Sequence, residues 1–462
     1  MCGIVGYIGP RDAALIILDG LGRLEYRGYD SAGLAVLQDG RIEVRRDVGK
    51  LSRLRSLVAD SPVTGNLGIG HTRWATHGAP AARNAHPHLG MRGDVVLVHN
   101  GIVENYLELR EELVAEGAVF KSETDTEVIV HLVERYLSSE TSLVEAAHRA
   151  LSHLRGAHAI VIFSSREPDK IIAARIGNAG GVTIGFGEGE MFIASDMPAI
   201  LEHTRRMTFL DSRQLAVITR EGLQVFSIGE GRKSEPLPYS IHTVAWDPVA
   251  AEKGEYRHFM NKEIHEQVRS LTETIAGRVD FDAARIRLPD LNLTPEFARQ
   301  IRKIIITACG TASHVGMVGR VLLERLARIP TEMDIASEFR YRDPIIEPGT
   351  VVLAISQSGE TADTLAAMEE ARSKGATLWS IVNVIGSQAM RLADGYVSMQ
   401  TGPEIGVAST KAYTAPLVDV YMLAVLLGDL RGFLSEQNRR QLVADLRLVP
   451  DLAGRCLDRE ED

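Results

Sequence analysis

A cysteine stands directly after the initiator methionine, at position 2. Its small side chain is compatible with removal of Met1, which would leave a thiol and a free α-amine on one residue. An α-amine has a pKa of about 8, so it can take the thiol proton at neutral pH, directly or through water. Cys2 is therefore a candidate nucleophile that needs no separate histidine. From its position alone, a cysteine that occurs there by chance is an equally good interpretation.

Side chains that could recognise an amino-acid zwitterion or an oxyanion gather in three segments of the first half. The segments are residues 23–33, 71–78 and 98–105. Arg73 could hold a carboxylate in bidentate fashion, and Asp125 could accept hydrogen bonds from an α-ammonium group. Asn100 and Gly101 offer a side-chain amide and a backbone N–H, the two donors that an oxyanion hole needs. Asn-Gly is also a common tight-turn dipeptide, so by itself it predicts only a hairpin.

The pair His86 and His88 has a spacing that could ligate a metal. No Cys, Asp or His converges with this pair to complete a site, so we expect no metal there. We expect His131, His153 and His158 to be structural or surface histidines.

Short apolar runs with few helical patterns between them extend from residue 4 to about residue 228. This pattern favours stacked, largely antiparallel sheets over a doubly wound parallel sheet. The expected strands include residues 33–37, 67–71, 95–99, 159–163, 171–174 and 192–194. The expected helices, which could cover the sheets as outer layers, are residues 12–23, 105–116, 126–137 and 143–154. Asp125 is the expected N-cap of the third of these helices.

Residues 233–255 sustain neither a helical nor a strand period, which predicts a domain boundary. A charged helix is expected next, at residues 257–276. Beyond it, apolar strands alternate with amphipathic helices, and this order predicts a parallel sheet covered on both faces. The expected strands are residues 303–308, 331–335, 350–356, 377–382 and 396–399. The expected helices are residues 313–327, 361–374 and 409–427.

Two of the strands in this second half end in loops rich in hydroxyl groups. The sequence CGTAS follows the strand that ends at residue 308, and SQSGET begins at residue 356. Hydroxyls, a glycine and free N–H groups at a helix N-terminus make a phosphate site, and ligands of open α/β sheets bind at the carboxyl ends of the strands. Helix capping would explain one such loop. Two loops at equivalent strand ends favour a ligand.

The composition, with 45% hydrophobic and 24% charged residues, is typical of a soluble globular protein, and 462 residues predict two or more domains. A net charge of -10 does not indicate a positively charged surface that would bind nucleic acid or anionic lipid. No stretch is expected to approach the roughly 20 apolar residues of a membrane span, and the start of the chain lacks the pattern of a signal peptide. Three scattered cysteines predict neither a disulfide framework nor a zinc site, and they suit the reducing cytoplasm.

Six motifs of the first half, in this order, resemble those of the class II glutamine amidotransferases, most closely of the glucosamine-6-phosphate synthase family. They are MCGIVGYIG, LEYRGYDSAG, HTRWATHG, NAHPH, VHNGIVEN and SETDTE. The resemblance implies an α+β N-terminal-nucleophile sandwich with two antiparallel sheets between helical layers (αββα). The catalytic residues that it implies are the nucleophile Cys2 and the oxyanion-hole residues Asn100 and Gly101. The glutamine-binding residues that it implies are Arg27 and Gly28 on a closing loop, Arg73, Trp74 as a gate for ammonia, Thr76, His77 and Asp125.

The second half resembles the sugar isomerase (SIS) phosphosugar-binding domain, an α/β fold with a parallel sheet. The residues that match those holding fructose 6-phosphate are Thr311, Ser313, Ser356, Gln357, Ser358, Thr361, Val407 and Ser409. The implied division is a glutaminase domain at residues 2–230, a linker and connecting helix at 231–285, and an SIS domain at 286–430. Residues 431–462 would begin a connector to a second SIS domain that this sequence does not contain.

The resemblance implies an enzyme that makes glucosamine 6-phosphate from fructose 6-phosphate and glutamine, as a cytoplasmic homodimer without a cofactor. Because the ring-opening and acid-base residues of the second SIS domain have no counterpart here, we expect this chain to hydrolyse glutamine and bind sugar phosphate but not to complete isomerisation. One alternative is a fragment with glutaminase activity only. Another is a glutamine phosphoribosylpyrophosphate amidotransferase, which the SQSGET sequence argues against. The third is a non-catalytic sugar-phosphate sensor, which would retain Met1.

Overall fold

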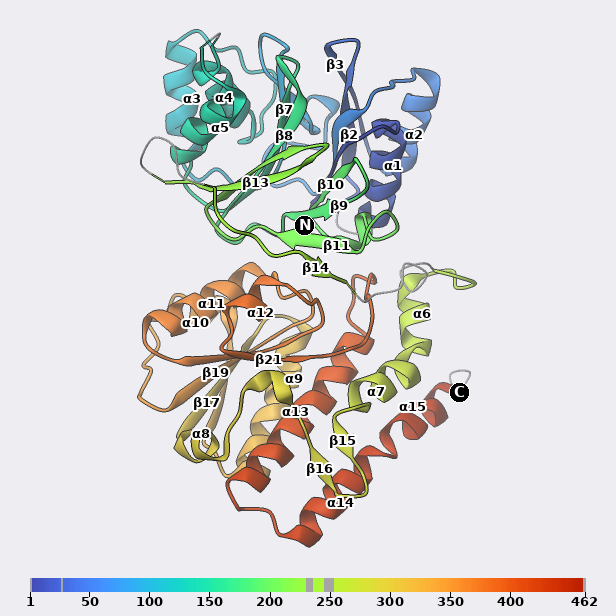
Figure 1. Cartoon of the computed structure of the whole chain (residues 1–462), viewed down its shortest axis with the longest axis vertical. Helices are drawn as coiled ribbons and strands as arrows, with labels where there is room; N and C mark the ends of the chain where they lie inside the picture. Colours follow the sequence, from blue (N-terminus) through green and yellow to red (C-terminus); the bar gives the residue numbers. More distant parts are fainter. Residues whose placement is uncertain (1, 26–27, 139, 230–235, 245–252, 460–462) are drawn as a thin grey trace. The chain divides into compact units, whose positions relative to one another are not determined.

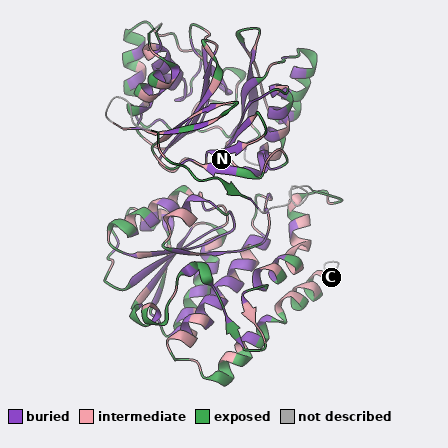
Figure 2. Cartoon of the chain, viewed as in Figure 1, coloured by how far each residue is buried: buried purple, intermediate pink, exposed green. Residues whose placement is uncertain are grey.

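The computed structural model describes residues 2–25, 28–138, 140–229, 236–244 and 253–459. The chain divides into two compact units, residues 1–248 and 249–462 (Figure 1). The first unit contains two antiparallel sheets, and the larger sheet of the second unit is parallel. In both units the sheets form the buried interior (Figure 2).

The first sheet has eight strands in the order β14-β11-β9-β10-β1-β4-β2-β3. Its strands are β1 (Gly3–Ile8), β2 (Ser31–Gln38), β3 (Arg41–Val48), β4 (Leu67–Arg73), β9 (Thr183–Phe186), β10 (Met191–Ala194), β11 (Arg206–Phe209) and β14 (His242–Thr243). The amino-terminal strand β1 lies in the interior of this sheet, paired on both sides, with β4 and with β10. The start of the chain is therefore fixed by hydrogen bonds along both edges of the strand.

The second sheet has six strands in the order β13-β12-β8-β7-β6-β5. They are β5 (His88–Leu89), β6 (Val95–Gly101), β7 (His158–Ser164), β8 (Glu167–Ile176), β12 (Gln214–Thr219) and β13 (Gly222–Ser227). Ile4 and Ile69 of the first sheet share one buried apolar cluster with Val98 and Val161 of the second. The two sheets thus pack face to face around a common core.

Helices cover the outer faces of this sandwich (Figure 1). Helices α1 (Ala13–Leu24) and α2 (Leu51–Asp60) pack on the eight-stranded sheet, and α3 (Tyr106–Ala115), α4 (Glu127–Tyr136) and α5 (Leu143–Ser152) form a core with the six-stranded sheet. The expected αββα sandwich is confirmed, and all six expected strands and four expected helices are present. Helix α2 was missed, because only Leu51, Leu54 and Val58 of its ten residues are buried and the apolar pattern is sparse.

The expected N-cap of α4 was wrong. Thr126 is the N-cap, and the helix begins at Glu127. The Asp125 carboxylate instead accepts a hydrogen bond from Val103 N–H, at 2.8 Å. The carboxylate therefore joins the start of α4 to the segment after β6.

The second unit contains a five-stranded parallel sheet in the order β18-β17-β19-β20-β21. The strands are β17 (Lys303–Ala308), β18 (Thr331–Ile335), β19 (Thr350–Ser356), β20 (Thr377–Val382) and β21 (Gly395–Ser398). A separate two-stranded ladder joins β15 (Val279–Asp280) to β16 (Arg285–Ile286). Four of the five expected strands match their observed bounds, and the fifth is shifted by one residue.

Two apolar clusters, one on each face of this sheet, hold the helices of the second unit. The helices are α6 (Phe259–His265), α7 (Gln267–Ile275), α8 (Pro295–Gln300), α9 (Thr311–Leu322), α10 (Ala336–Phe339), α11 (Ala362–Ser373), α12 (Gln388–Leu392), α13 (Lys411–Leu430), α14 (Glu436–Leu446) and α15 (Val449–Leu457). The expected helix at residues 257–276 is two helices, separated at Glu266, and α9 continues as a π-helical turn over Leu323–Ala327.

Helix α13 has the length and apolar character of a membrane span, with a mean hydropathy of 1.4. The expectation that no stretch approaches such a span was therefore wrong. The helix nevertheless buries both Lys411 and Asp419, and it packs against α7 and α9. These contacts identify α13 as the central core helix of the second unit.

A buried ion pair fixes α13 in place. Arg278 Nη1 donates to Asp419 Oδ1 at 3.0 Å and to Thr274 O at 3.3 Å, and Nη2 donates to Ser398 O. The Asp419 side chain is fully buried, and burial raises its pKa to about 7 despite the opposing effect of the guanidinium. One arginine therefore connects α7, the end of β21 and α13.

Replacement of Asp419 by alanine is expected to lower the free energy of unfolding by about 3–5 kcal/mol, because it leaves Arg278 buried without its partner. Urea unfolding followed by circular dichroism measures the change. The matched control is Asp429→Ala on the same helix, which removes a partly exposed pair with Arg439 and should cost less than about 1 kcal/mol. Equal losses in the two variants would contradict a special role for the buried pair.

Candidate active site

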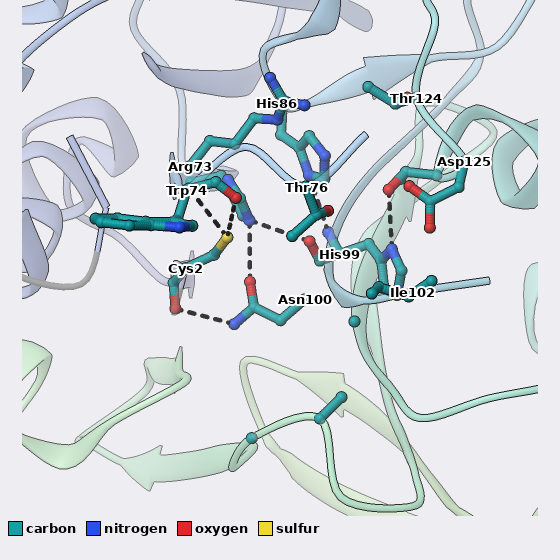
Figure 3. Close-up of a pocket in the computed structure, with 15 residues that line it drawn as sticks. Cys2, Arg73, Trp74, Thr76, His86, His99, Asn100, Ile102, Thr124 and Asp125 are labelled. Atoms are coloured by element: carbon teal, nitrogen blue, oxygen red, sulfur yellow. Dashed lines mark hydrogen bonds between the residues drawn. The ribbon is translucent and has the colours of Figure 1, made fainter. Parts of the chain in front are cut away.

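The thiol of Cys2 lies beside the end of strand β4. The register of β1 and β4 places Gly3 opposite Thr72, and a Cβ at Gly3 would lie only 2.6 Å from Thr72 Oγ1. Trp74 N–H donates to Cys2 Sγ at 3.2 Å, and Sγ donates to Trp74 O at 3.6 Å (Figure 3). The main chain of Trp74 thus holds the sulfur on both its donor and its acceptor side.

Asn100 reaches Cys2 from the second sheet, at the end of β6. Its Nδ2 donates to Cys2 O at 3.2 Å (Figure 3). Gly101 ends the same strand with a φ of 132°, and a Cβ there would clash with Ala157 O. This dipeptide is not a hairpin turn, because Gly101 pairs with His158 of β7, which follows only after three helices. Strand β6 therefore presents a carboxamide to Cys2, followed by a backbone site that requires glycine.

These residues border a cavity of about 320 Å³, a volume suited to a small molecule. Seven of the predicted residues line it: Cys2, Arg73, Trp74, Thr76, Asn100, Gly101 and Asp125. Lining residues without a predicted binding role are His71, His86, His99, Ile102, Thr124, Thr126, Ala179 and Gly180.

Arg73 and Asp125 give the cavity one buried positive group and one buried negative group. Arg73 Nη2 donates to His77 O and Gly78 O, whereas Nη1 is buried without a hydrogen-bond partner among the described residues. Asp125 is 3% exposed, and its Oδ1 lies 3.9 Å from His77 Nδ1. A free guanidinium nitrogen and a carboxylate in one small cavity fit the two charged ends of an amino acid.

Burial dominates the electrostatics of the site. It raises the pKa of the Cys2 thiol above its usual value, although the N–H of Trp74 opposes this effect. Burial also raises the pKa of Asp125, against the hydrogen bond from Val103 and the charge of His77. A thiol with a raised pKa is protonated at neutral pH, so nucleophilic attack by Cys2 requires a base.

Five buried histidines form a connected cluster, and three of them line the cavity: His71, His86 and His99, with His88 and His158 beside them. The rings of His71 and His86 stack with centroids 4.2 Å apart, and His99 Nε2 lies 3.1 Å from His158 Nδ1. His86 Nδ1 accepts from His99 N–H at 3.3 Å. Among the described residues, no group of three or more His, Cys, Asp or Glu side chains could hold a metal ion. The alternation of His71 and Arg73 on one face of a strand was the sequence signal that could have revealed the first of these histidines.

Two predicted glutamine-binding residues, Gly28 and His77, are not among the residues that line the cavity. His77 borders it through Asp125. Gly28 packs on the main chain of Arg73, where a Cβ would lie 2.7 Å from the Arg73 carbonyl carbon. Arg27 lies outside the described residues. The indole of Trp74, a lining residue, is 49% exposed and contacts the ring of Tyr29 edge-on, with centroids 5.3 Å apart.

The predicted sugar-phosphate residues lie at the carboxyl ends of the parallel strands. Thr311 and Ser313 follow β17, Ser356 is the last residue of the neighbouring strand β19, and residues 357–361 follow it. Ser356 Oγ lies 3.1 Å from Thr361 Oγ1 and accepts from Gly359 N–H at 3.0 Å. Neither α9 nor α11 has a side-chain cap at its N-terminus. Among the described residues, no side chain therefore occupies these two helix N-termini, which suits an anion, although Ser313 N–H and Oγ both donate to Gly310 O.

Val407 and Ser409 lie in the segment between β21 and α13, whose residue Gly402 accepts from Asn383, a residue that also donates through its N–H to Gln357 O. Val407 is 86% exposed, and Ser409 Oγ donates to Glu404 Oε2 at 3.2 Å. Glu404 also accepts from the N–H groups of Thr410 and Ala412, so the N-terminus of α13 is already occupied by a carboxylate. Of the three predicted loops, the two after β17 and β19 are the better anion sites.

Both halves of the chain match known families. The family model described as a glutamine amidotransferase domain matches residues 59–227, and the SIS domain model matches residues 298–426. A glutamine–fructose-6-phosphate aminotransferase (isomerizing) of Symbiobacterium thermophilum is 49% identical over 460 residues, which are 100% of this chain and 74% of that protein. The chain belongs to the glutamine–fructose-6-phosphate aminotransferase family. A Thermus thermophilus member is 48% identical over 459 residues, covering 99% of this chain and 74% of that protein.

Among solved structures, the C-terminal domain of glucosamine-fructose-6-phosphate aminotransferase from Francisella tularensis is similar, with a TM-score of 0.41 and 35% identity. That match covers 44% of this chain and 56% of the other.

The histidine cluster predicts a loss of stability in mild acid. Burial lowers the pKa of His71 and His158 to about 4 and of His88 to about 3, and it places His86 and His99 well below their usual value. Below about pH 6.5 the unfolded chain binds protons on these histidines, whereas the folded chain does not. The free energy of unfolding therefore decreases as the pH falls from about 6.5 toward about 4.

Each of these histidines should contribute about 1.4 kcal/mol per pH unit to the slope of the unfolding free energy against pH. His131 and Asp419 have the opposite sign, because the raised pKa of each favours the folded state as the pH falls through this range. Guanidinium unfolding of the chain between pH 7 and 5 measures the net slope, and His158→Gln should reduce it by the equivalent of about one proton. A flat profile over this range would contradict neutral buried histidines.

Proposed function

We propose that the chain is a glutamine-dependent aminotransferase that uses fructose 6-phosphate as the acceptor and acts in the synthesis of glucosamine 6-phosphate. The observation that supports this most directly is that Cys2, Asn100 and Arg73 line one cavity, with Asn100 Nδ2 hydrogen-bonded to Cys2 O and Arg73 Nη1 buried without a partner among the described residues. The curated relatives of this family carry that activity in their names.

In the proposed reaction, removal of Met1 frees the Cys2 α-amine, which takes the proton of the thiol. Sγ then attacks the side-chain carbonyl carbon of glutamine, and the oxyanion accepts hydrogen bonds from Asn100 Nδ2 and Gly101 N–H. The C–N bond breaks, the nitrogen takes a proton and leaves as ammonia, and a γ-glutamyl thioester remains on Cys2. Water hydrolyses the thioester to glutamate and restores the thiol.

Glutamine is held by its two charged ends. We assign its α-carboxylate to Arg73 and its α-ammonium group to Asp125, with Thr76 and His77 beside them. Arg27, Gly28 and Trp74 belong to the segments that would close over the bound amino acid. Hydrogen bonds to charged groups are stronger than neutral ones, so this pair would set both affinity and orientation.

Fructose 6-phosphate is assigned to the second unit. The phosphate would lie at the N-termini of α9 and α11, near Thr311, Ser313, Ser356, Gln357, Ser358 and Thr361, with Val407 and Ser409 on the segment between β21 and α13. We assign the glutaminase domain to residues 2–230, the linker and connecting helix to 231–285, the SIS domain to 286–430 and the start of a further connector to 431–462.

The 462 residues cover 74% of the length of the Symbiobacterium relative. We assign ring opening and isomerisation to the part of the relatives that lies outside this match. We propose a cytoplasmic homodimer.

Protein made in a bacterial host is expected to lack Met1 by intact-mass analysis and to release glutamate from glutamine. The Cys2→Ala variant removes the nucleophile and should abolish that release, while Cys456→Ala, at an exposed free cysteine, serves as the control and should not change it. Retention of Met1 together with undiminished glutamate release by Cys2→Ala would refute the proposed glutaminase.

The second unit is expected to bind fructose 6-phosphate without efficient conversion of it. The sugar phosphate should raise the thermal midpoint of the chain by mass action, and unphosphorylated fructose, the matched control, should not. With glutamine present, the 462-residue chain should form glutamate in excess of glucosamine 6-phosphate. Formation of the two products in equal amounts would contradict the assignment of isomerisation to the additional length of the relatives.

A further inference from the structure

His71 lies at the back of the cavity, on β4, two residues before Arg73. It is 1% exposed, and the reaction proposed above gives it no task. Its Nε2 is within hydrogen-bond distance of two atoms, Asn100 Oδ1 at 3.0 Å and His99 O at 3.1 Å. Its Nδ1 is buried without a hydrogen-bond partner among the described residues. Buried polar atoms are usually hydrogen-bonded, so a buried histidine with two partners on one ring nitrogen and none on the other is unusual.

The surroundings of Asn100 determine which way its amide faces. Cys2 O can only accept a hydrogen bond, so the NH2 group of Asn100 faces Cys2 and Oδ1 faces His71. Nε2 of His71 then faces two acceptors, Asn100 Oδ1 and His99 O, and must carry the hydrogen. His71 is therefore the Nε2–H tautomer, with a bare Nδ1.

The other histidines of the cluster reinforce this arrangement. His158 Nε2 lies 3.1 Å from Arg155 O and donates to it, so His158 Nδ1 accepts from His99 Nε2–H. His86 Nδ1 accepts from His99 N–H, and the His86 ring stacks on His71. The main chain of His99, one of the two acceptors of His71, is thus held in place from several directions.

We propose that His71 is a positioning residue that fixes the side-chain amide of Asn100, so that Nδ2 and not Oδ1 faces the oxyanion formed at Cys2. This inference rests on the proposed glutaminase function. Without the Nε2–H donor, Oδ1 would lose its buried partner, and only Cys2 O would still oppose a half-turn of the amide that exchanges its oxygen and nitrogen. A carbonyl oxygen would then face the developing negative charge. Donation to Oδ1 also polarises the amide and strengthens the hydrogen bond that Nδ2 gives.

Two substitutions separate this role from a purely structural one. His71→Gln places a carboxamide nitrogen near the position of Nε2, whereas His71→Asn carries the same group one methylene shorter. His71→Asn is expected to lower kcat for glutamate release by about 10²-fold, the effect of losing one oxyanion-hole donor. The KM for glutamine should change by less than about threefold, because Arg73 and Asp125 bind the amino acid independently. His71→Gln should restore kcat to within about tenfold of the starting protein.

Equal kcat values for the starting protein and His71→Asn would overturn the proposal, as would equal losses in the two variants. Neutron diffraction of the unsubstituted chain gives a test that needs neither activity nor a folded variant. Deuterium on His71 Nε2, with Nδ1 bare and Asn100 Nδ2 facing Cys2 O, supports the positioning role. Deuterium on Nδ1 with Nε2 bare, or Asn100 Oδ1 facing Cys2, would refute it. Absence of glutamate release by the unsubstituted chain would instead count against the proposed function, and the neutron result would still decide the role of His71.

Discussion

The register of β1 between β4 and β10 is the constraint on which the candidate active site depends. Hydrogen bonds along both edges of β1 fix the position of Gly3, and therefore of the residue before it. A slip of one residue would turn every side chain of the strand to the opposite face, so burial of Ile4 against the second sheet holds the register. Packing of the two sheets then brings β6 to the same place, with Asn100 beside Cys2. The site is thus a consequence of strand pairing in one sheet and of core packing between two.

Placing charged and polar groups in such a core has an energetic cost that the hydrogen bonds around them offset. Asp125 accepts from a backbone N–H, and Arg73 donates to two carbonyl groups while keeping one nitrogen free. The five histidines around them provide donors and acceptors without adding charge, because burial keeps them neutral. Five further cations beside Arg73 would repel it and one another. Neutral histidines therefore allow the amide of Asn100 to be oriented without further charge in the core.

Much of the fold followed from local patterns in the sequence. Apolar runs predicted six strands of the sandwich and the parallel sheet of the second unit, because buried strands leave a clear signature in the chain. Helix α2 escaped detection because few of its residues are buried, and the span-like character of α13 was underestimated because Lys411 and Asp419 interrupt its apolar pattern. Of the candidate site, the sequence motifs identified Cys2, Arg73, Asn100 and Asp125. The task proposed for His71 depends on which atoms face Nε2 across the two sheets, and no spacing along the chain reveals that.

In the proposed mechanism, Cys2 takes up the γ-glutamyl group of glutamine in the cavity formed with Asn100 and Arg73. Rapid acid quenching during turnover, followed by mass analysis of the peptides, would capture this intermediate. We expect a γ-glutamyl thioester on a peptide that begins with Cys2 and carries a free α-amine. Glutamate release accompanied by an adduct on Cys309 or Cys456, or by no cysteine adduct at any quench time, would contradict it.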